Sequence, residues 1–455
     1  MNSIIIFSLI MMLFMIIVSN KNSFKKVFST NESAFQPMNN DFKENNILKV
    51  SESPSTPKRK FVMGKAPFIR TTDEGINSTS KMMIDVIIAL VPIILFAWYK
   101  NGIKPFISLQ NVSVLVMLWP LLFVIVGGLT SFILEALYFA LFKQVVGFKE
   151  CLKASWNSYS LIPGLLLSLI LPLYTPIWML MLGCFMANII FKMLFGGFGY
   201  NIFNPALIGY AFIMAAFGGS IGNAYLNPDE IFNLTTSSTP LAILNSNLGA
   251  SYNELVGQYG NLWNYFIGTT PGSLGETSAL LCVVAFIYLS VRRTINWYVP
   301  ITYVGTVFAL AWIIGAINGQ PGIWYPTFNI LTGGLLFGAV FMATEPVTSP
   351  KTPSGKVLFA LFLGVFTVLF RFVGSMNEGV ATSILFMCLF SGVIDRFTAE
   401  SRSSTISKRI VIKWAIVVLL LVGIAGYTIY KCVPTKEVEA LMYHFSSESF
   451  YLGGK

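Results

Sequence analysis

Charged residues are scarce in this chain of 455 residues. Asp, Glu, Lys and Arg make up 11% of the sequence, whereas hydrophobic residues make up 55%. Soluble domains usually carry about 25% charged residues, and several apolar runs here approach the ~20 residues that a helix needs to cross a bilayer. This composition excludes an ordinary soluble domain and predicts an all-α polytopic membrane protein.

The chain also has few residues that could bind a metal or act as acid–base catalysts through a histidine. His444 is the sole histidine, and the five cysteines form no CxxC pair. The chain also lacks a glycine-rich dinucleotide fingerprint. Catalysis that depends on histidine, a zinc or iron–sulfur site held by clustered cysteines, and direct binding of NADH are therefore not expected.

Basic residues are absent from Met193 to Val291, although the chain has a net charge of +10. Elsewhere they gather between the apolar runs, where the positive-inside rule places them on the cytoplasmic side. Alternation of spans then puts the basic-free interval Gly218–Pro271 outside, with Lys100 and Lys104 as exceptions. The charge does not indicate nucleic-acid binding, because the chain lacks the polar surface that such binding needs.

The order of apolar and polar stretches divides the chain into four parts. Residues 1–19 are expected to form a hydrophobic anchor, and residues 20–81 a polar cytoplasmic linker. Residues 82–398 form the expected membrane core, with the interval 218–271 outside, and residues 399–455 add one further helix and a tail. The expected spans are Met83–Tyr99, Val114–Phe142, Ser160–Tyr174, Pro176–Leu194, Asn204–Phe217, Ser278–Val291, Val299–Ala316, Ile330–Ala343, Val357–Phe372, Gly379–Ile394 and Trp414–Tyr430.

An internal repeat is visible within the core. Leu161–Pro172 resembles Leu331–Met342, and Phe195–Asn201 resembles Phe372–Gly379. Because each half would hold five spans, an odd number, the second half would be inverted relative to the first. Such repeats with interrupted helices place a site near the middle of the membrane. The alternative is chance similarity between Leu- and Gly-rich membrane helices.

Polar residues near the apolar segments mark candidate sites. Asp85, Glu135, Glu345 and Asp395 lie within or beside spans, where a carboxylate is costly and usually faces a cavity, a partner or an ion path. For Asp85 and Asp395 a solvated position at the membrane surface is an equal alternative. Asn204 before Pro205 is typical of a helix N-terminus, which follows a flexible turn with Gly196, Gly197 and Gly199.

Several motifs in order along the chain together resemble one known family. They are Ala66-Pro-Phe-Ile-Arg70 with Ser80-Lys-Met-Met-Ile-Asp85, Gly196-Gly-Phe-Gly-Tyr-Asn-Ile-Phe-Asn-Pro-Ala-Leu-Ile-Gly-Tyr210, Pro271-Gly-Ser-Leu-Gly-Glu276, Phe341-Met-Ala-Thr-Glu-Pro-Val-Thr-Ser-Pro350 with Thr352-Pro-Ser-Gly-Lys356, and Glu378-Gly-Val-Ala381 leading to Ile394-Asp395. The chain resembles the D subunit of the bacterial Rnf electron-transport complex and its relative, the B subunit of the Na⁺-translocating NADH:quinone reductase. The Thr-Ser-Pro and Thr-Pro-x-Gly-Lys forms favour the Rnf protein.

The resemblance implies a covalent flavin. In the family a Ser/Thr-Gly-Ala-Thr loop carries FMN, joined through its phosphate to the hydroxyl of the last Thr. The matching positions are Thr236-Ser237-Ser238-Thr239, so Thr239 is the implied acceptor for a flavin transferase. Ser237 and Ser238 stand where the family has Gly and Ala, which leaves Thr236 and Ser238 as alternative acceptors. Judged by residue types alone, the stretch is an ordinary polar loop.

The resemblance also implies how flavins and ions are held. Asn201, Asn204 and Thr344 are the expected lining of a bound flavin, and a second, non-covalent flavin (riboflavin or FMN) is expected on the cytoplasmic side. Asp85, Glu135, Glu345 and Asp395 become the candidates for handling Na⁺ or H⁺. Thr344 beside Glu345 would supply an oxygen ligand for Na⁺.

These features lead to one expected function and two alternatives. The expected protein is a multi-pass subunit of an Rnf-type ferredoxin:NAD⁺ oxidoreductase complex in a bacterial plasma membrane. It would relay electrons through covalent FMN, together with the other subunits, and couple transfer to Na⁺ or H⁺ transport. One alternative is a flavin-independent transporter or channel for a small solute, built on the same inverted repeat. The other is an assembly subunit that has lost its flavin.

Overall fold

The computed structural model describes most of the membrane core and the helix that follows it. The described residues are 79–108, 113–142, 147–221, 241, 243–244, 247–270, 272–275, 278–374, 379–403 and 408–434. Across these ranges every regular element is a helix. The expected anchor at residues 1–19, most of the linker 20–81, and Thr236, Ser238 and Thr239 lie outside the described residues.

The first half of the core contains five apolar helical segments. They are α3 (Thr79–Trp98, continued by η1, Tyr99–Ile103, and α4, Lys104–Ser108), α5 (Val114–Phe142), α7 (Leu161–Ile170), α8 (Ile177–Phe185) with η2 (Met186–Met193), and α9 (Pro205–Ile221). Short helix α6 (Phe148–Asn157) separates α5 from α7. The η1 and η2 segments are π-helical, a geometry that is often found at functional sites.

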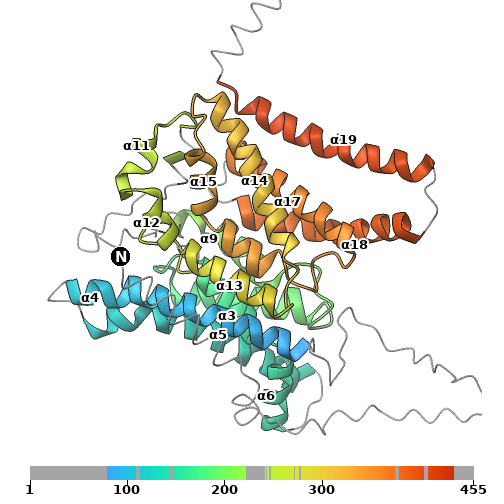
Figure 1. Cartoon of the computed structure of the whole chain (residues 1–455). Helices are drawn as coiled ribbons and strands as arrows, with labels where there is room; N and C mark the ends of the chain where they lie inside the picture. Colours follow the sequence, from blue (N-terminus) through green and yellow to red (C-terminus); the bar gives the residue numbers. More distant parts are fainter. Residues whose placement is uncertain are drawn as a thin grey trace, which may run out of the picture.

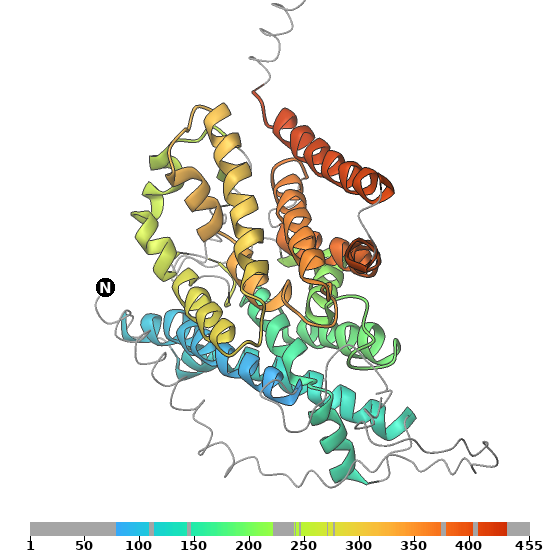
Figure 2. The same ribbon diagram turned by 45° about the vertical axis from the view of Figure 1, so that its right-hand side comes forward.

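The second half follows a stretch of short helices. These are α11 (Tyr252–Leu255), η4 (Gly257–Tyr259) and α12 (Leu262–Ile267). The apolar helices are then α13 (Ala279–Val291), α14 (Tyr298–Ile317), α15 (Trp324–Leu331), α16 (Leu335–Phe337) with the π-helical η5 (Gly338–Met342), α17 (Pro353–Phe372) and α18 (Gly379–Ser403). Helix α19 (Lys408–Lys431) packs on the outside of α17. In Figures 1 and 2 α3, α5 and α6 lie below α14, α15 and α17.

Each span expected from the sequence overlaps a helical segment, and Ile330–Ala343 covers α16–η5 and only the last two residues of α15. Six helices are long and apolar enough to cross a membrane, and a seventh span results if α15 and the α16–η5 segment, bent by 66°, are counted together. The other apolar helices, α7, α8–η2, α9 and α13, are shorter. The multi-pass, all-helical architecture is therefore confirmed for the described residues.

Helix α6 was not among the expected spans, and its sequence explains why. It is amphipathic: Cys151 and Ser155 are buried, whereas Phe148 is 79% exposed and Trp156 is 43% exposed. Ser155 Oγ donates a hydrogen bond to the carbonyl of Phe132 on α5 at 2.9 Å. In Figure 1 α6 lies across the direction of α3 and α5, as a helix at a membrane surface does.

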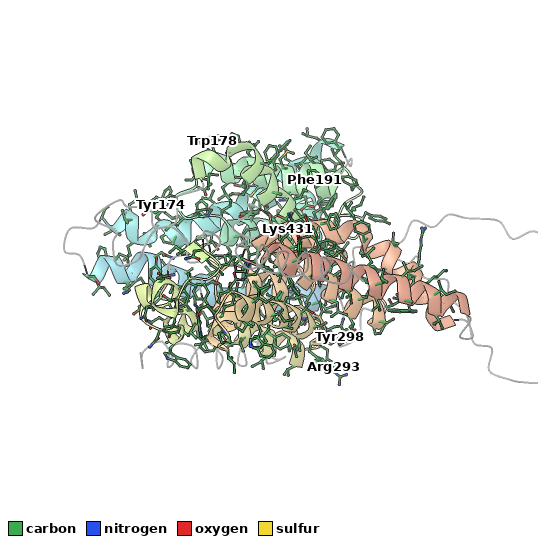
Figure 3. All side chains as sticks on the ribbon, turned by 90° about the horizontal axis from the view of Figure 1, so that it is seen from above. Tyr174, Trp178, Phe191, Arg293, Tyr298 and Lys431 are labelled. Atoms are coloured by element: carbon green, nitrogen blue, oxygen red, sulfur yellow. The ribbon has the colours of Figure 1, made fainter. Side chains whose placement is uncertain are left out.

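The long helices define two ends of the bundle. We call the end that contains Thr294 and Tyr298 the inner end, and the end that contains Lys100 and Asn318 the outer end. Helix α14 connects them with 20 residues, a length of about 30 Å at 1.5 Å per residue. In Figure 3 Phe191, Arg293 and Tyr298 lie farther to the right than Tyr174 and Trp178, so α8–η2 runs toward the inner end.

Lys100, an exception to the charge rule, has a structural explanation. Its side chain is 4% exposed, and Nζ donates a hydrogen bond to the carbonyl of Thr270. Lys100 lies in a helical segment, where it fixes the outer end of α3, and not in a loop between spans. The positive-inside rule counts loop residues, and it therefore does not apply to this side chain.

Candidate functional site

The glycine turn before α9 has the conformation that its sequence predicts. Gly196, Gly197 and Gly199 have φ angles of 120°, 95° and 95°, values that side chains rarely tolerate. Asn204 Oδ1 accepts hydrogen bonds from the backbone N–H groups of the second and third residues of α9 at 3.1 and 3.3 Å. The predicted N-cap is confirmed, and it holds Asn204 in a fixed, buried position.

Glu345 reaches this turn from the other half of the chain. It lies between η5 and α17, and its Oε1 accepts a hydrogen bond from Asn201 Nδ2 at 3.3 Å. Its Oε2 accepts one from Thr348 Oγ1 at 2.9 Å. Thr344 Oγ1 donates to the carbonyl of Val340 in the preceding turn. Asn201 and Glu345 therefore meet although they are 144 residues apart in sequence.

A partly open pocket lies at the inner end where these residues meet. Asn201, Asn204, Thr344 and Glu345 all line it. Its walls are otherwise mostly apolar and come from both halves of the core: α3, α7 and the start of α9 on one side, η5 and the segment after α13 on the other. Few polar groups among apolar walls are typical of sites for small ligands and cofactors.

Burial changes the acid–base behaviour of Glu345. Removal of water from around the carboxyl group raises its pKa to about 7, against the lowering effect of the hydrogen bonds from Thr348 and Asn201 and of the charge on Lys192. A carboxyl group with this pKa exchanges protons near neutral pH.

Glu135 is completely buried and forms an ion pair inside the bundle. Lys192 Nζ lies 3.0 Å from Glu135 Oε1 and 3.1 Å from Oε2, and it donates a hydrogen bond to the carbonyl of Ser158 at 2.7 Å. Ser158 Oγ donates to Glu135 Oε1 at 2.7 Å. The carboxylate thus has the charge partner and the hydrogen bonds that a buried ion requires. Lys192 also lines the pocket beside Glu345.

Asp85 forms a second ion pair near the pocket. Its carboxylate accepts hydrogen bonds from Arg292 at 3.2 and 3.3 Å, from Tyr288 Oη at 3.2 Å and from Thr294 Oγ1 at 3.1 Å. These contacts join the first turns of α3 to the end of α13 at the inner end. Thr294 also lines the pocket, so the pair fixes one of its walls.

Asp395 lies away from the pocket and caps a loop. Its Oδ1 accepts hydrogen bonds from the backbone N–H of Lys351 at 2.9 Å, and from the N–H and the hydroxyl of Thr352 at 3.1 Å each. Thr352 is in turn the N-cap of α17. The four acids expected to handle ions therefore occupy separate places, and no group of three acids, cysteines or histidines suited to a metal occurs among the described residues.

Leu241, two residues after Thr239 in the chain, belongs to a different region. It is buried in an outer-end cluster with Leu244, Tyr265, Tyr325 and Phe328. The pocket lies at the opposite end of α14, about 30 Å away by the length of that helix. Asn201, Asn204 and Thr344 therefore lie together, but far from Leu241.

Comparison with known proteins gives the same result as the motifs. Residues 62–404 match the family described as NQR2, RnfD, RnfE. This chain belongs to that family. The match spans most of the sequence and includes the inner-end pocket, α13 to α18 and the expected acceptor loop.

Curated relatives show which complexes the family serves. The D subunit of the proton-translocating ferredoxin:NAD(+) oxidoreductase complex of Clostridium ljungdahlii is 35% identical over 348 residues, covering 76% of this chain and 96% of the relative. The Na(+)-translocating counterpart from Acetobacterium woodii is 30% identical, with coverages of 75% and 94%. The B subunit of the Na(+)-translocating NADH-quinone reductase of Chromohalobacter salexigens is 34% identical, with coverages of 61% and 70%.

One pocket residue of this family member was not identified from the sequence. Lys192 stands in the apolar run Pro176–Leu194 as its only charged residue. A lysine at membrane depth is as costly as a carboxylate, so the same argument that selected Glu135 could have selected it. The pairing of the two residues, 57 positions apart, is visible only in the structure.

Proposed function

We propose that this protein is a membrane subunit of an Rnf-type ion-translocating ferredoxin:NAD⁺ oxidoreductase complex. It relays electrons through flavins, and the relay is coupled to the movement of Na⁺ or H⁺. Family membership and similarity to two D subunits over nearly their full length support the complex type. Because one relative is named proton-translocating and the other Na⁺-translocating, similarity alone does not select the ion.

The inner-end pocket is the observation that carries the flavin assignment. An isoalloxazine ring has a hydrophobic benzenoid end and a pyrimidine end rich in hydrogen-bonding groups. Asn201, Asn204, Thr344 and Glu345 offer donors and acceptors on one wall, and Phe198, Phe341 and their apolar neighbours offer the hydrophobic walls. A flavin supplies one- and two-electron chemistry when bound. The residues of the pocket would bind and orient the ring and exclude water from it.

This pocket suits the second, non-covalent flavin. Its lining lies at the end of α14 opposite to Leu241, the described residue nearest in sequence to Thr239. A covalent FMN at Thr239 would belong to the outer end. The two sites together would place one flavin at each end of the bundle, with Thr239 facing the extracytoplasmic side and the pocket facing the cytoplasm.

The proposed inverted repeat is supported by matching side chains on α8–η2 and α17. Asn188 and Lys192 are four residues apart near the end of η2, and Thr367 and Arg371 have the same spacing near the end of α17. All four side chains are buried, with exposed fractions of 0 to 2%. Lys192 lies at the inner end and Arg371 at the outer end, as inversion requires.

Partners of these side chains also correspond. Asn188 donates to Ser131 of α5 at 2.7 Å, and Thr367 bonds the hydroxyl of Tyr303 of α14 at 2.6 Å. The two basic side chains also donate to backbone carbonyls at 2.7 Å. Lys192 donates to the carbonyl of Ser158, and Arg371 donates to that of Asn329. Helices α5 and α14 hold the same place in the two halves, so the correspondence extends beyond one helix pair.

The test of the covalent flavin is in-gel fluorescence. The full chain is expressed with its flavin transferase, denatured and viewed under ultraviolet light. We expect a fluorescent band that disappears in Thr239→Ala, because the phosphoester needs that hydroxyl. Thr236→Ala and Ser238→Ala are matched controls from the same loop and should stay fluorescent.

Other outcomes have definite meanings. A band that persists in Thr239→Ala but is lost in one of the two controls would move the acceptor to that residue. A dark wild-type band, with the transferase active on a known acceptor, would refute the covalent flavin. Peptide mass measurement of the fluorescent band locates the adduct independently.

A further inference from the structure

Lys192 holds a position between the pocket and a buried negative charge. Its side chain is 2% exposed and lines the pocket, whereas Glu135 is fully buried and does not line it. Ser158, whose hydroxyl and carbonyl hold the two charges, is also absent from the lining. Lys192 is therefore the member of the ion pair that lines the pocket, and its charge acts on the pocket residue Glu345.

The orientation of this ion pair has an electrostatic consequence. The pair is neutral overall, which limits the cost of its burial, but its positive end is the nearer one to the pocket. A nearby positive charge favours the more negative form of a group. In a mostly apolar site away from salt, this effect is weakly screened. Any ligand whose charge changes in the pocket will therefore bind more tightly in its more negative state.

We propose that Lys192 is a positioning residue that raises the reduction potential of the flavin in the inner-end pocket. This inference rests on the proposed function, because it requires a flavin at that site. Each electron delivered to the ring by its redox partner adds one negative charge there. Lys192 forms no covalent bond to the flavin and acts only through its charge, which Glu135 and Ser158 hold in place.

Two substitutions of the ion pair should have opposite effects. Lys192→Met removes the positive charge and leaves the carboxylate of Glu135 without its partner, so the reduced flavin binds less well and the potential falls. Glu135→Gln leaves the ammonium without its counter-charge, so the potential rises. A merely structural pair would instead give loss of flavin, or no shift, in both variants.

The experiment uses the full chain with Thr239→Val, so that non-covalent flavin is the only flavin present. Flavin content is measured by chromatography after denaturation, and the midpoint potential by spectroelectrochemical titration with mediators. We expect at least a tenfold change in the ratio of reduced to oxidised affinity for each variant, which corresponds to about 59 mV for a one-electron step. Lys192→Arg, which keeps the charge, and Lys153→Met, on exposed α6, should leave the potential near its starting value.

The outcomes separate this inference from the proposed function. Retained flavin with unchanged potentials, or with shifts in the same direction, would overturn the role of Lys192 and leave the pocket assignment standing. No non-covalent flavin in the Thr239→Val protein would overturn both. If Lys192→Met does not fold, Glu135→Gln compared with Lys192→Arg decides the question, because only the first should raise the potential.

Discussion

At the scale of single residues, the candidate acids differ in the side chains that surround them. Glu135 and Asp85 each have a basic partner within 3.3 Å. The described neighbours of Glu345 within hydrogen-bonding distance are neutral: Asn201 and Thr348. Glu345 is also the one of the four candidates for ion handling that lines the pocket.

The pKa of Glu345 gives a pH-dependent signal. Since burial raises this pKa from 4.5 to about 7, we expect a protonated-carboxyl C=O band in the infrared spectrum that disappears as pH rises through about 7. Glu345→Gln should remove the band, whereas Glu150→Gln, which changes an exposed acid on α6, should not. A band that titrates near 4.5 would contradict the effect of burial.

The same pKa determines the sign of the effect on stability. The carboxyl group binds its proton more tightly in the folded protein than in the unfolded chain. Its contribution to stability is therefore complete below about pH 4.5 and is lost as pH rises through about 7. Thermal unfolding of the wild type should shift downward across this range relative to Glu345→Gln.

At the scale of elements, the start of α17 depends on a side chain from α18. Asp395 accepts backbone N–H groups of Lys351 and Thr352, and Thr352 then caps α17. Hydrogen bonds to a charged acceptor contribute about 1.5–3 kcal/mol each, and a buried donor without a partner costs about 1–3 kcal/mol. Although Asp395 was a candidate for ion handling, these contacts give it a structural task.

A substitution at Asp395 should therefore affect folding before it affects transport. We expect Asp395→Ala to lower the stability of the purified protein by about 1–3 kcal/mol, measured by thermal or chemical unfolding. Asp395→Asn keeps one acceptor oxygen and should lose less. If Asp395→Ala has wild-type stability but abolishes ion-coupled electron transfer in the assembled complex, the residue belongs to the ion path instead.

At the scale of the whole molecule, the inner and outer ends are expected to face opposite sides of the membrane. The five native cysteines are all buried, so an introduced cysteine on the surface can be labelled selectively. Asn253→Cys, on exposed α11, should react with a membrane-impermeant maleimide in intact cells. Lys153→Cys, on α6, should react only after the cells are opened. Labelling of both variants, or of Lys153→Cys alone, in intact cells would refute this topology.

The sequence by itself determined the class of the protein and most of its helices. Apolar length specifies a membrane helix almost independently of context, because the bilayer requires about 20 residues whose backbone groups bond to one another. The N-cap at Asn204 was likewise predictable, since capping is a contact between residues two and three positions apart. The family followed from motifs that stand in the same order along the chain.

Only the tertiary structure decided which of these residues meet. Glu345 contacts Asn201 across 144 positions, and Lys192 contacts Glu135 across 57. The sequence analysis missed α6 because this helix is short and amphipathic and does not resemble a membrane span. It also missed α15, which is short and meets α16 at a bend of 66°. Contacts between distant positions depend on how helices pack, and packing is a property of several surfaces at once that no local pattern encodes.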